Sequence, residues 1–152
     1  MKSIFHDCKV TVLSQEVADD TLVTFRPVDM AADGGYEGVA FAIGVQEGSI
    51  VTTYVAHAQQ DTTSGFGTAA DLEGTALTFS SITGAKTVLL DIYKPAERWV
   101  RPILLVPNTA ATVIVSCTAI QYNARQAPAT QDATTSGSWT GEFHAQPAEG
   151  TP

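Results

Sequence analysis

The chain has few residues at spacings that support catalysis or metal binding. Its three histidines, His6, His57 and His144, are far apart, and none lies at metal-ligand spacing from another histidine or from a cysteine. Asp19 and Asp20 are adjacent, so in a turn their side chains diverge, and nothing marks them as a coupled acid–base pair. No serine lies in a nucleophile-elbow sequence. We therefore expect a protein that is not an enzyme and that uses no metal or cofactor.

One short segment matches a dinucleotide-binding loop in its letters only. Residues 65–70, Gly-Phe-Gly-Thr-Ala-Ala, follow the GxGxxA pattern, which needs a strand before it and a helix after it. Asp71 and Glu73 follow and would repel phosphate, and no helical pattern continues from them. We interpret the segment as an ordinary loop.

The residue types most enriched at protein contacts gather in residues 93–102. Three of the eight Lys and Arg residues lie there together with two large aromatic residues, and arginine and aromatic side chains are enriched at protein interfaces. The alternative is a turn in which Arg98 and Arg101 form local salt bridges with Glu97 and Asp91. The two interpretations are compatible, and both remain open at this point.

We expect Tyr93 or Trp99 to be the apolar anchor of such a contact, with Arg98 or Arg101 hydrogen-bonding to the partner. Further candidates come from the C-terminal part of the chain. The complete set of candidate interface residues is Tyr93, Arg98, Trp99, Arg101, Tyr122, Arg125, Trp139 and Phe143.

Short β-patterned runs must position these side chains, because helical periodicity is almost absent. In residues 112–122, Val113, Val115 and Cys117 alternate with polar residues, so one face packs and the other is solvated or covered by a partner. Strands are expected at residues 21–26, 38–46, 50–58, 75–80, 87–93, 99–106 and 112–122. Residues 1–125 are therefore expected to form one all-β domain, an antiparallel β-sandwich or barrel of jelly-roll or immunoglobulin-like type.

Three local features refine this expectation. Residues 46–49, Gln-Glu-Gly-Ser, are typical of a hairpin turn between two of the strands. Pro102 interrupts an apolar run and places its strand at a sheet edge, or else marks a bulge. Cys8 and Cys117 are the only cysteines, and we expect two separate thiols because no cysteine-rich framework is present.

The composition is acidic and poor in charge. Charged residues make up 16% of the chain, and the net charge is −8. No basic run is present, which argues against a nucleic-acid partner. A surface covered by Thr, Ser, Gln, Gly and Ala suits contact with other proteins. No apolar signal core follows the N-terminus, and no stretch is long enough to span a bilayer, so we expect a protein made in the cytoplasm with no membrane partner.

The composition changes after Arg125. Residues 126–152 consist mainly of Gln, Ala, Pro, Thr, Ser and Gly, with Trp139 and Phe143 as the large apolar residues. Such a segment buries too little apolar surface to offset roughly 1–2 kcal/mol of backbone entropy per ordered residue. We expect an extended C-terminal arm that becomes ordered only against a partner, by adding a strand to an exposed sheet edge.

Three segments resemble a known family. Residues 93–102 (Tyr-Lys-Pro-Ala-Glu-Arg-Trp-Val-Arg-Pro), 119–128 (Ala-Ile-Gln-Tyr-Asn-Ala-Arg-Gln-Ala-Pro) and 141–151 resemble small proteins of tailed bacteriophages that are encoded near the major capsid gene, the head decoration or cement proteins. The resemblance covers residues 93–152, and the preceding part is similar only in its strand pattern. It implies a virion protein that binds the major capsid protein on the outer capsid surface, acts as a homotrimer and clamps neighbouring capsid subunits.

Other functions remain open at this level. A tail or neck component of the virion would also be all-β, and it would differ from a decoration protein in copy number. A carbohydrate-binding β-sandwich module would present aromatic residues on a flat face, for which Tyr54, Tyr93, Trp99 and Tyr122 are available. An enzyme would require two carboxylates distant in the sequence to meet in the fold.

Overall fold

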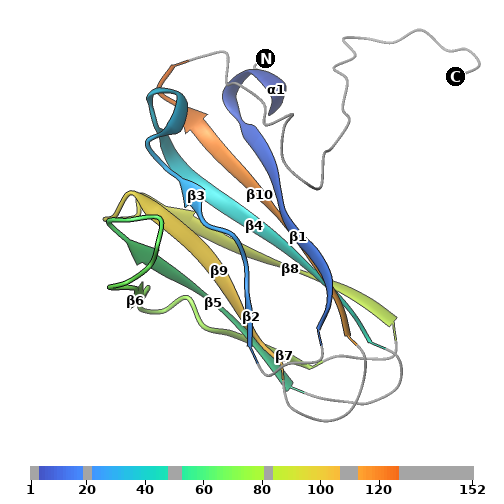
Figure 1. Ribbon diagram of the computed structural model, residues 1–152. Coiled ribbons are helices and arrows are strands. Elements are labelled where there is room, and N and C mark those ends of the chain that lie inside the picture. The colour runs from blue at the N-terminus through green and yellow to red at the C-terminus, as the bar shows by residue number, and fades with distance from the viewer. Residues whose placement is uncertain (1–3, 19–21, 48–52, 81–83, 107–112, 127–152) are drawn as a thin grey trace, which may run out of the picture.

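The computed structural model describes residues 4–18, 22–47, 53–80, 84–106 and 113–126. These segments form two antiparallel sheets packed face to face (Figure 1). Helical structure in this part of the chain is limited to a single turn, α1 (Ile4–Asp7), and a 3-10 turn, η1 (Ala32–Gly34). No helix in these ranges has the length and apolar character needed to cross a membrane. The expected all-β antiparallel sandwich is confirmed.

The two sheets differ in size. The four-stranded sheet has the order β1 (Lys9–Ala18), β10 (Val113–Ala124), β4 (Tyr36–Glu47) and β8 (Gly84–Tyr93). In the six-stranded sheet, β9 (Trp99–Leu105) pairs on one side with β2 (Leu22–Thr24) and β3 (Val28–Asp29), and on the other side with β5 (Thr53–Asp61). The strand β5 also pairs with β6 (Ala70–Asp71) and β7 (Leu77–Ser80).

The strand pairing is that of a jelly roll. We count β2 and β3 as one interrupted strand and set the two-residue β6 aside. The first strand then pairs with the last (β1 with β10), the second with the seventh (β2–β3 with β9), the third with the sixth (β4 with β8) and the fourth with the fifth (β5 with β7). This is the result of rolling one long antiparallel hairpin into two sheets. Of the two sandwich types that the sequence left open, the topology is therefore that of the jelly roll.

The core lies between the sheets and follows the alternation of the sequence. In β10, Val113, Val115 and Cys117 are at most 2% exposed, as predicted. The neighbouring β4 buries every second residue in the same way, and β5 and β9 contribute from the opposite sheet. The central residues of this core are Val39, Phe41, Ile43, Val45, Tyr54, Ala56, Val100, Leu104, Val113, Val115 and Cys117.

The predicted hairpin between residues 38–46 and 50–58 is wrong. The two strands form as β4 and β5, but β4 lies in the four-stranded sheet and β5 in the six-stranded sheet. The strand β4 therefore pairs with strands far away in the sequence, β10 and β8, and not with β5. A glycine-containing connection between two amphipathic strands has the same composition whether the strands pair or face each other across the core.

Of the two alternatives predicted for Pro102, the sheet edge is wrong, because β9 lies between β2–β3 and β5. An irregularity is present instead, since the three residues 25–27 lie opposite the two residues 101–102 of β9. The carbonyl oxygen of Pro102 accepts a hydrogen bond from the Phe25 amide at 3.4 Å. In an antiparallel strand the nitrogen of a residue points to the same side as its oxygen. The Pro102 nitrogen, which has no proton to donate, therefore faces the interruption between β2 and β3, where a ladder hydrogen bond is not required.

Sequence reasoning missed β1. Its buried face carries Thr11 and Leu13, whereas Val10 and Val12 are partly exposed, so the apolar pattern misidentifies the inner face. The register with β10 shifts between Val12 and Ser14, which makes Leu13 a bulge and interrupts the alternation.

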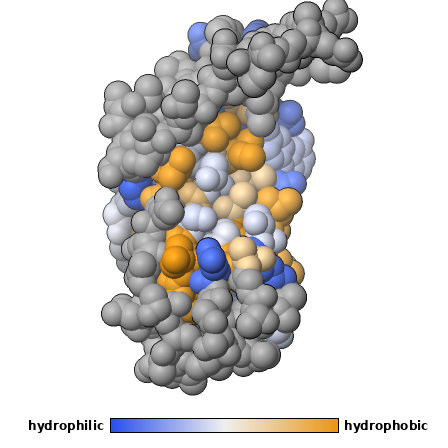
Figure 2. All heavy atoms as spheres, turned by 90° about the vertical axis from the view of Figure 1, so that its right-hand side faces the viewer, coloured by the Kyte–Doolittle hydropathy of each residue, from blue (hydrophilic) through white to orange (hydrophobic). Residues whose placement is uncertain are grey.

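The outer face of the four-stranded sheet is poor in charge. Figure 2 views the molecule from the right-hand side of Figure 1 and shows mainly orange and pale residues across the middle of this face, with blue toward its margins. The residues of β4 that face outward are small, since Ala40, Ala42 and Gly44 alternate with the buried Phe41 and Ile43.

Candidate protein-interaction site

The candidate interface residues that the structure describes lie at one end of the sandwich. The strands β8 and β10 both run antiparallel to β4, so Tyr93 and Tyr122, near their C-terminal ends, lie at the same end of the sheet. The strand β9 begins at this end because a short loop connects it to β8. Two candidates, Trp139 and Phe143, and all of the arm of residues 126–152 beyond Gln126 lie outside the described residues.

The residues that are clustered in the sequence are divided between two faces. The loop of residues 94–98 crosses from the four-stranded to the six-stranded sheet. Tyr93 and Tyr122 both pair with Gly38 and therefore share the outer face of the four-stranded sheet. Trp99 and Arg101 alternate with buried residues of β9 and lie on the outer face of the six-stranded sheet. The interface candidates within residues 93–102 therefore do not form a single contiguous surface.

Arg98 is held by a partner distant in the sequence. Its Nε and Nη2 atoms donate to Oδ1 and Oδ2 of Asp29 at 2.9 and 2.7 Å, a bidentate ion pair. The hydrogen bond from Arg98 is the main reason why the pKa of Asp29 lies below its ordinary value, although partial burial opposes this shift. The guanidinium also lies 5.5 Å from the centre of the Trp99 ring. Arg98 therefore pairs with Asp29 and not with Glu97, the local partner that the sequence suggested.

Arg101 is held by a neighbouring strand and by a loop. Its Nε and Nη2 atoms donate to Oε1 of Gln59 at 3.0 and 2.8 Å, and its guanidinium stacks 4.1 Å from the centre of the Phe66 ring. Burial lowers the pKa of Arg101 below its ordinary value, with Asp61 opposing. The proposed salt bridge to Asp91 does not form, because Asp91 lies on the other sheet.

The loop that carries Phe66 is organised by Asp61, a residue that sequence reasoning did not select. Asp61 is 2% exposed and accepts hydrogen bonds from the amides of Thr63 and Thr68, each at 2.8 Å, and from nearby threonine hydroxyls. The amide of Thr63 is the main cause of a lowered pKa at Asp61, and burial works in the opposite direction. An Asp followed two residues later by Thr is a recognisable turn signal. Residues 65–70 therefore belong to a turn after β5, as expected, with no helix following.

Tyr122 and Tyr93 each donate a hydrogen bond to a carboxylate. The Tyr122 hydroxyl donates to Asp91 at 2.7 Å, and the Tyr93 hydroxyl donates to Glu37 at 3.2 Å. Partial burial, reinforced by Asp91, raises the pKa of Tyr122 to about 12. The Tyr122 ring lies over Gly38, where an added Cβ atom would overlap its Cζ atom.

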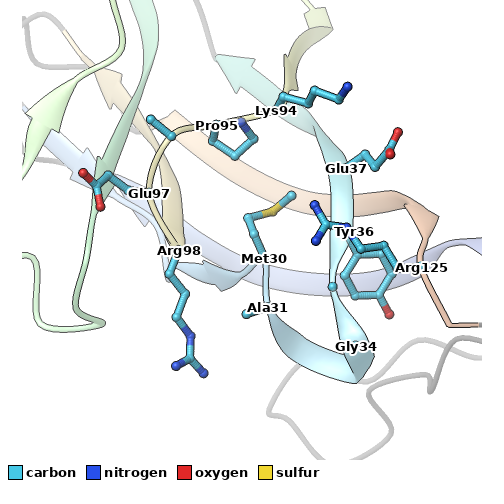
Figure 3. A pocket seen from close by; sticks show the side chains of 12 residues that line it. Met30, Ala31, Gly34, Tyr36, Glu37, Lys94, Pro95, Glu97, Arg98 and Arg125 are labelled. Carbon is cyan, nitrogen blue, oxygen red and sulfur yellow. The ribbon is translucent and has the colours of Figure 1, made fainter.

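An open pocket of about 490 Å³ lies at this end of the sandwich. Figure 3 shows Met30 pointing into it below the loop of residues 94–98, with Arg125 on the opposite side from Glu97. The backbone of the loop is anchored because Gln60 Oε1 accepts the amide protons of Ala96 and Glu97 at 3.1 and 3.3 Å. The lining residues carry charges of both signs: Glu37, Glu97, Lys94, Arg98 and Arg125.

The chain leaves β10 beside this pocket. The Arg125 amide donates to the Gly35 carbonyl at 2.9 Å, and the Gln126 side chain packs against Gly34, where a Cβ atom would lie 3.0 Å from it. The start of the C-terminal arm is therefore fixed next to η1 and close to the loop that carries Arg98.

The described residues contain no cluster of His, Cys, Asp and Glu that could hold a metal ion. Cys8 and Cys117 both lie in the described part of the chain and are not joined by a disulfide. Burial raises the pKa of Cys117 to about 12, so its thiol is a poor nucleophile at neutral pH. What the described residues offer at this end is a set of fixed arginine and aromatic side chains, which can bind another surface.

Comparisons with known proteins add little to this description. No family model and no curated protein matches the chain. Among solved structures, it is similar to a chain from Bacillus endospore appendages, described as a novel family of disulfide-linked pili, with 13% sequence identity and a TM-score of 0.45. The match covers 78% of this chain and 88% of the other. A similarity at this level does not bear on function.

Proposed function

We propose that this chain is a structural virion protein of a tailed bacteriophage that decorates the capsid. In this role it binds the major capsid protein on the outer surface of the particle, assembles as a homotrimer and clamps neighbouring capsid subunits. It is made in the host cytoplasm and acts on the virion, with no catalytic step and no cofactor. The identity of the family rests on the resemblance of residues 93–102, 119–128 and 141–151.

One structural observation supports this proposal most strongly. Arginine and aromatic side chains gather at the same end of the jelly roll as the start of the C-terminal arm. Arg98 is fixed by Asp29, and Arg101 is fixed by Gln59 and Phe66. Side chains that are already held in place lose little conformational entropy when a partner binds, so more of the contact energy is available for affinity.

The arm supplies the second half of the clamp in this proposal. An extended segment can add a strand to an exposed sheet edge of a neighbouring subunit, which gains main-chain hydrogen bonds along its length. Trp139 and Phe143 are the large apolar residues that could anchor it. The domain end would then bind one capsid subunit while the arm reaches another.

Copy number on purified particles tests the proposal. A decoration protein is expected to co-purify with intact particles at a stoichiometry that approaches that of the major capsid protein. A neck or tail component would be present in only a few copies per particle, and absence from purified particles would contradict both assignments. Quantitative protein analysis of density-purified particles gives the answer directly.

A double variant tests the role of the domain end. Arg98→Ala combined with Arg101→Ala should reduce particle occupancy more than it reduces thermal stability. Lys86→Ala is a matched control, because it removes a cation at the opposite end of β8, where Lys86 contacts Phe79 and the Ser80 carbonyl. If the double variant lowers the melting temperature but occupies particles normally, the two arginines only support the fold.

A further inference from the structure

The outer face of the four-stranded sheet is nearly without charge. Its residues are those that alternate with the buried positions of β1, β10, β4 and β8 and pair with one another across the strands. Among the described side chains of this face, Asp91 is the one that carries a charge, and it accepts the Tyr122 hydroxyl. The described outward residues are Val10, Val12, Ile114, Ser116, Thr118, Ile120, Tyr122, Ala40, Ala42, Gly44, Gln46, Ala85, Thr87, Leu89, Asp91 and Tyr93.

Large apolar side chains on this face are exposed. Leu89 is 67% exposed and lies beside Ala42 of β4, and Ile114 is 42% exposed and lies beside Gln46 of the same strand. A shallow pocket of about 270 Å³ lies over Gly44, lined in part by Ile114 and Thr87. Leu89 on β8 and Ile114 on β10 therefore project on either side of β4, whose outward residues Ala40, Ala42 and Gly44 are small.

The low charge of this face makes it the surface through which a second copy can approach. Each chain carries a net charge of −8, so two copies repel, and this repulsion is smallest where they meet through a surface with few carboxylates. On this face the charged group is Asp91, near one end, where Tyr122 donates to it. The central rows around Ala42 are uncharged and could approach their equivalents without placing like charges opposite each other.

The size of the face is sufficient for a specific contact. Four strands about 4.8 Å apart, each with about nine residues at about 3.3 Å, cover roughly 500 Å² of flat area per copy. Two copies would bury about 1,000 Å² together, which is near the lower limit for a biological interface. A reversible dimer is therefore expected, weaker than an obligate one.

We propose that two copies of this chain associate through the outer faces of their four-stranded sheets. The contact is isologous, so the same residues meet from both sides of a two-fold axis, and the two sheets pack as sheets do in a β-sandwich. Leu89 and Ile114 of each copy pack against the small-residue strip of the other. This pairing does not depend on capsid binding or on the C-terminal arm, and it can join two chains or two larger assemblies.

Two charge substitutions test the contact in the full chain. Leu89→Asp places a carboxylate halfway along the edge strand β8, beside Ala42, and should raise the dissociation constant for pairing by about tenfold or more. Leu105→Asp is the matched control, because Leu105 is also an exposed leucine, 41% against 67% for Leu89, and lies on the other sheet. Ser116→Asp, at another exposed site of the same face, gives an independent variant should Leu89→Asp fold poorly.

Sedimentation equilibrium over a range of concentrations is the measurement. We expect the wild type and Leu105→Asp to show the same doubling of mass with concentration, from monomer to dimer or from trimer to hexamer, and Leu89→Asp or Ser116→Asp to lose that doubling. Added salt should strengthen the pairing, because screening weakens the repulsion between two acidic chains. Constant monomer mass in the wild type at every salt concentration, or equal association of the Leu89→Asp and Leu105→Asp variants, would overturn the proposal. Neither result would affect particle binding, which is measured separately.

Discussion

At the scale of single residues, the polar side chains near the candidate site are held by partners far away in the sequence or by a folded loop. Arg98 reaches Asp29, and Gln121 donates from the four-stranded sheet to the Asp29 carbonyl at 2.9 Å. Asp61 gathers the amides and hydroxyls of the loop that follows it. These contacts position the side chains of the site, so their removal should be visible in stability.

Asp61→Asn should lower the melting temperature at neutral pH by several degrees. The amide nitrogen of asparagine would place a donor opposite the Thr63 or Thr68 amide, and two donors cannot bond to each other. The folded pKa of Asp61 lies below its ordinary value of 3.8, so the carboxylate contributes stability above that pH and loses it as the pH falls through the folded pKa. The deficit of the variant relative to the wild type should therefore shrink in acid.

Thermal melts of both proteins from neutral pH to below 3.8 check this prediction. Glu73→Gln, which removes an exposed carboxylate in a nearby turn, should change the melting temperature little. A deficit that stays constant with pH would show that the ionised form of Asp61 is not what stabilises the loop.

Gly38→Ala should destabilise the fold by about 1–3 kcal/mol, because a Cβ atom would overlap the Tyr122 ring and displace it. Adding Tyr122→Ala should recover part of this loss, since the obstructing ring is removed. Gly65→Ala is the control, because a Cβ atom there meets no atom within 4 Å. Chemical denaturation of the single and double variants gives the coupling, and additive effects would argue against the steric explanation.

At the scale of elements, β10 is the strand on which the sandwich most depends. It lies between β1 and β4 in the four-stranded sheet, buries Val113, Val115 and Cys117, and ends at the candidate site. Interior strands of this kind tolerate a charge on the outer face much better than on the inner face, because only the inner face is removed from water.

Val115→Asp should prevent folding, since it would place an unpaired charge in the core at a residue that is fully buried. Ser116→Asp, the next residue in the same strand, faces outward and should fold. Circular dichroism and thermal unfolding of both variants make the comparison. A soluble Val115→Asp variant with a cooperative melt would show that the facing of β10 is assigned wrongly.

At the scale of the whole molecule, the jelly roll brings the ends of β8 and β10 and the start of β9 to one end. The C-terminal arm begins at this end, beside η1. The other candidate surface, the outer face of the four-stranded sheet, is formed by four strands that are far apart in the sequence. The fold thus separates a charged, aromatic end from an uncharged face.

Ending the chain after Arg125 should leave a folded domain that occupies particles poorly or fails to trimerise. The cut falls beyond β10, which ends at Ala124, and keeps the hydrogen bond from Arg125 to Gly35. The melting temperature should stay close to that of the full chain, while binding to particles stripped of the protein should fall. Full occupancy by the shortened chain would show that the arm is not part of the clamp.

The class of the fold and most of its strands follow from the amino-acid sequence alone. Alternation with a period of two is a local property, so the inner face of β10 was predictable from Val113, Val115 and Cys117 without any knowledge of partners. The loop at residues 65–70 and the absence of a helix after it were also predictable, because Asp71, Glu73 and the lack of a helical pattern are local features too. Where the alternation is interrupted, as at the Leu13 bulge, the prediction failed.

Which strands pair and which side chains meet became clear from the three-dimensional structure. The sequence around residues 46–49 does not distinguish a hairpin from a crossing between sheets, and Pro102 is tolerated inside a sheet because its partner strand is interrupted there. The pairing of Arg98 with Asp29 joins residues 69 positions apart, although Glu97 is adjacent. Such contacts depend on how two sheets pack over a shared core, and that packing is an interaction among all the strands at once, which no local pattern encodes.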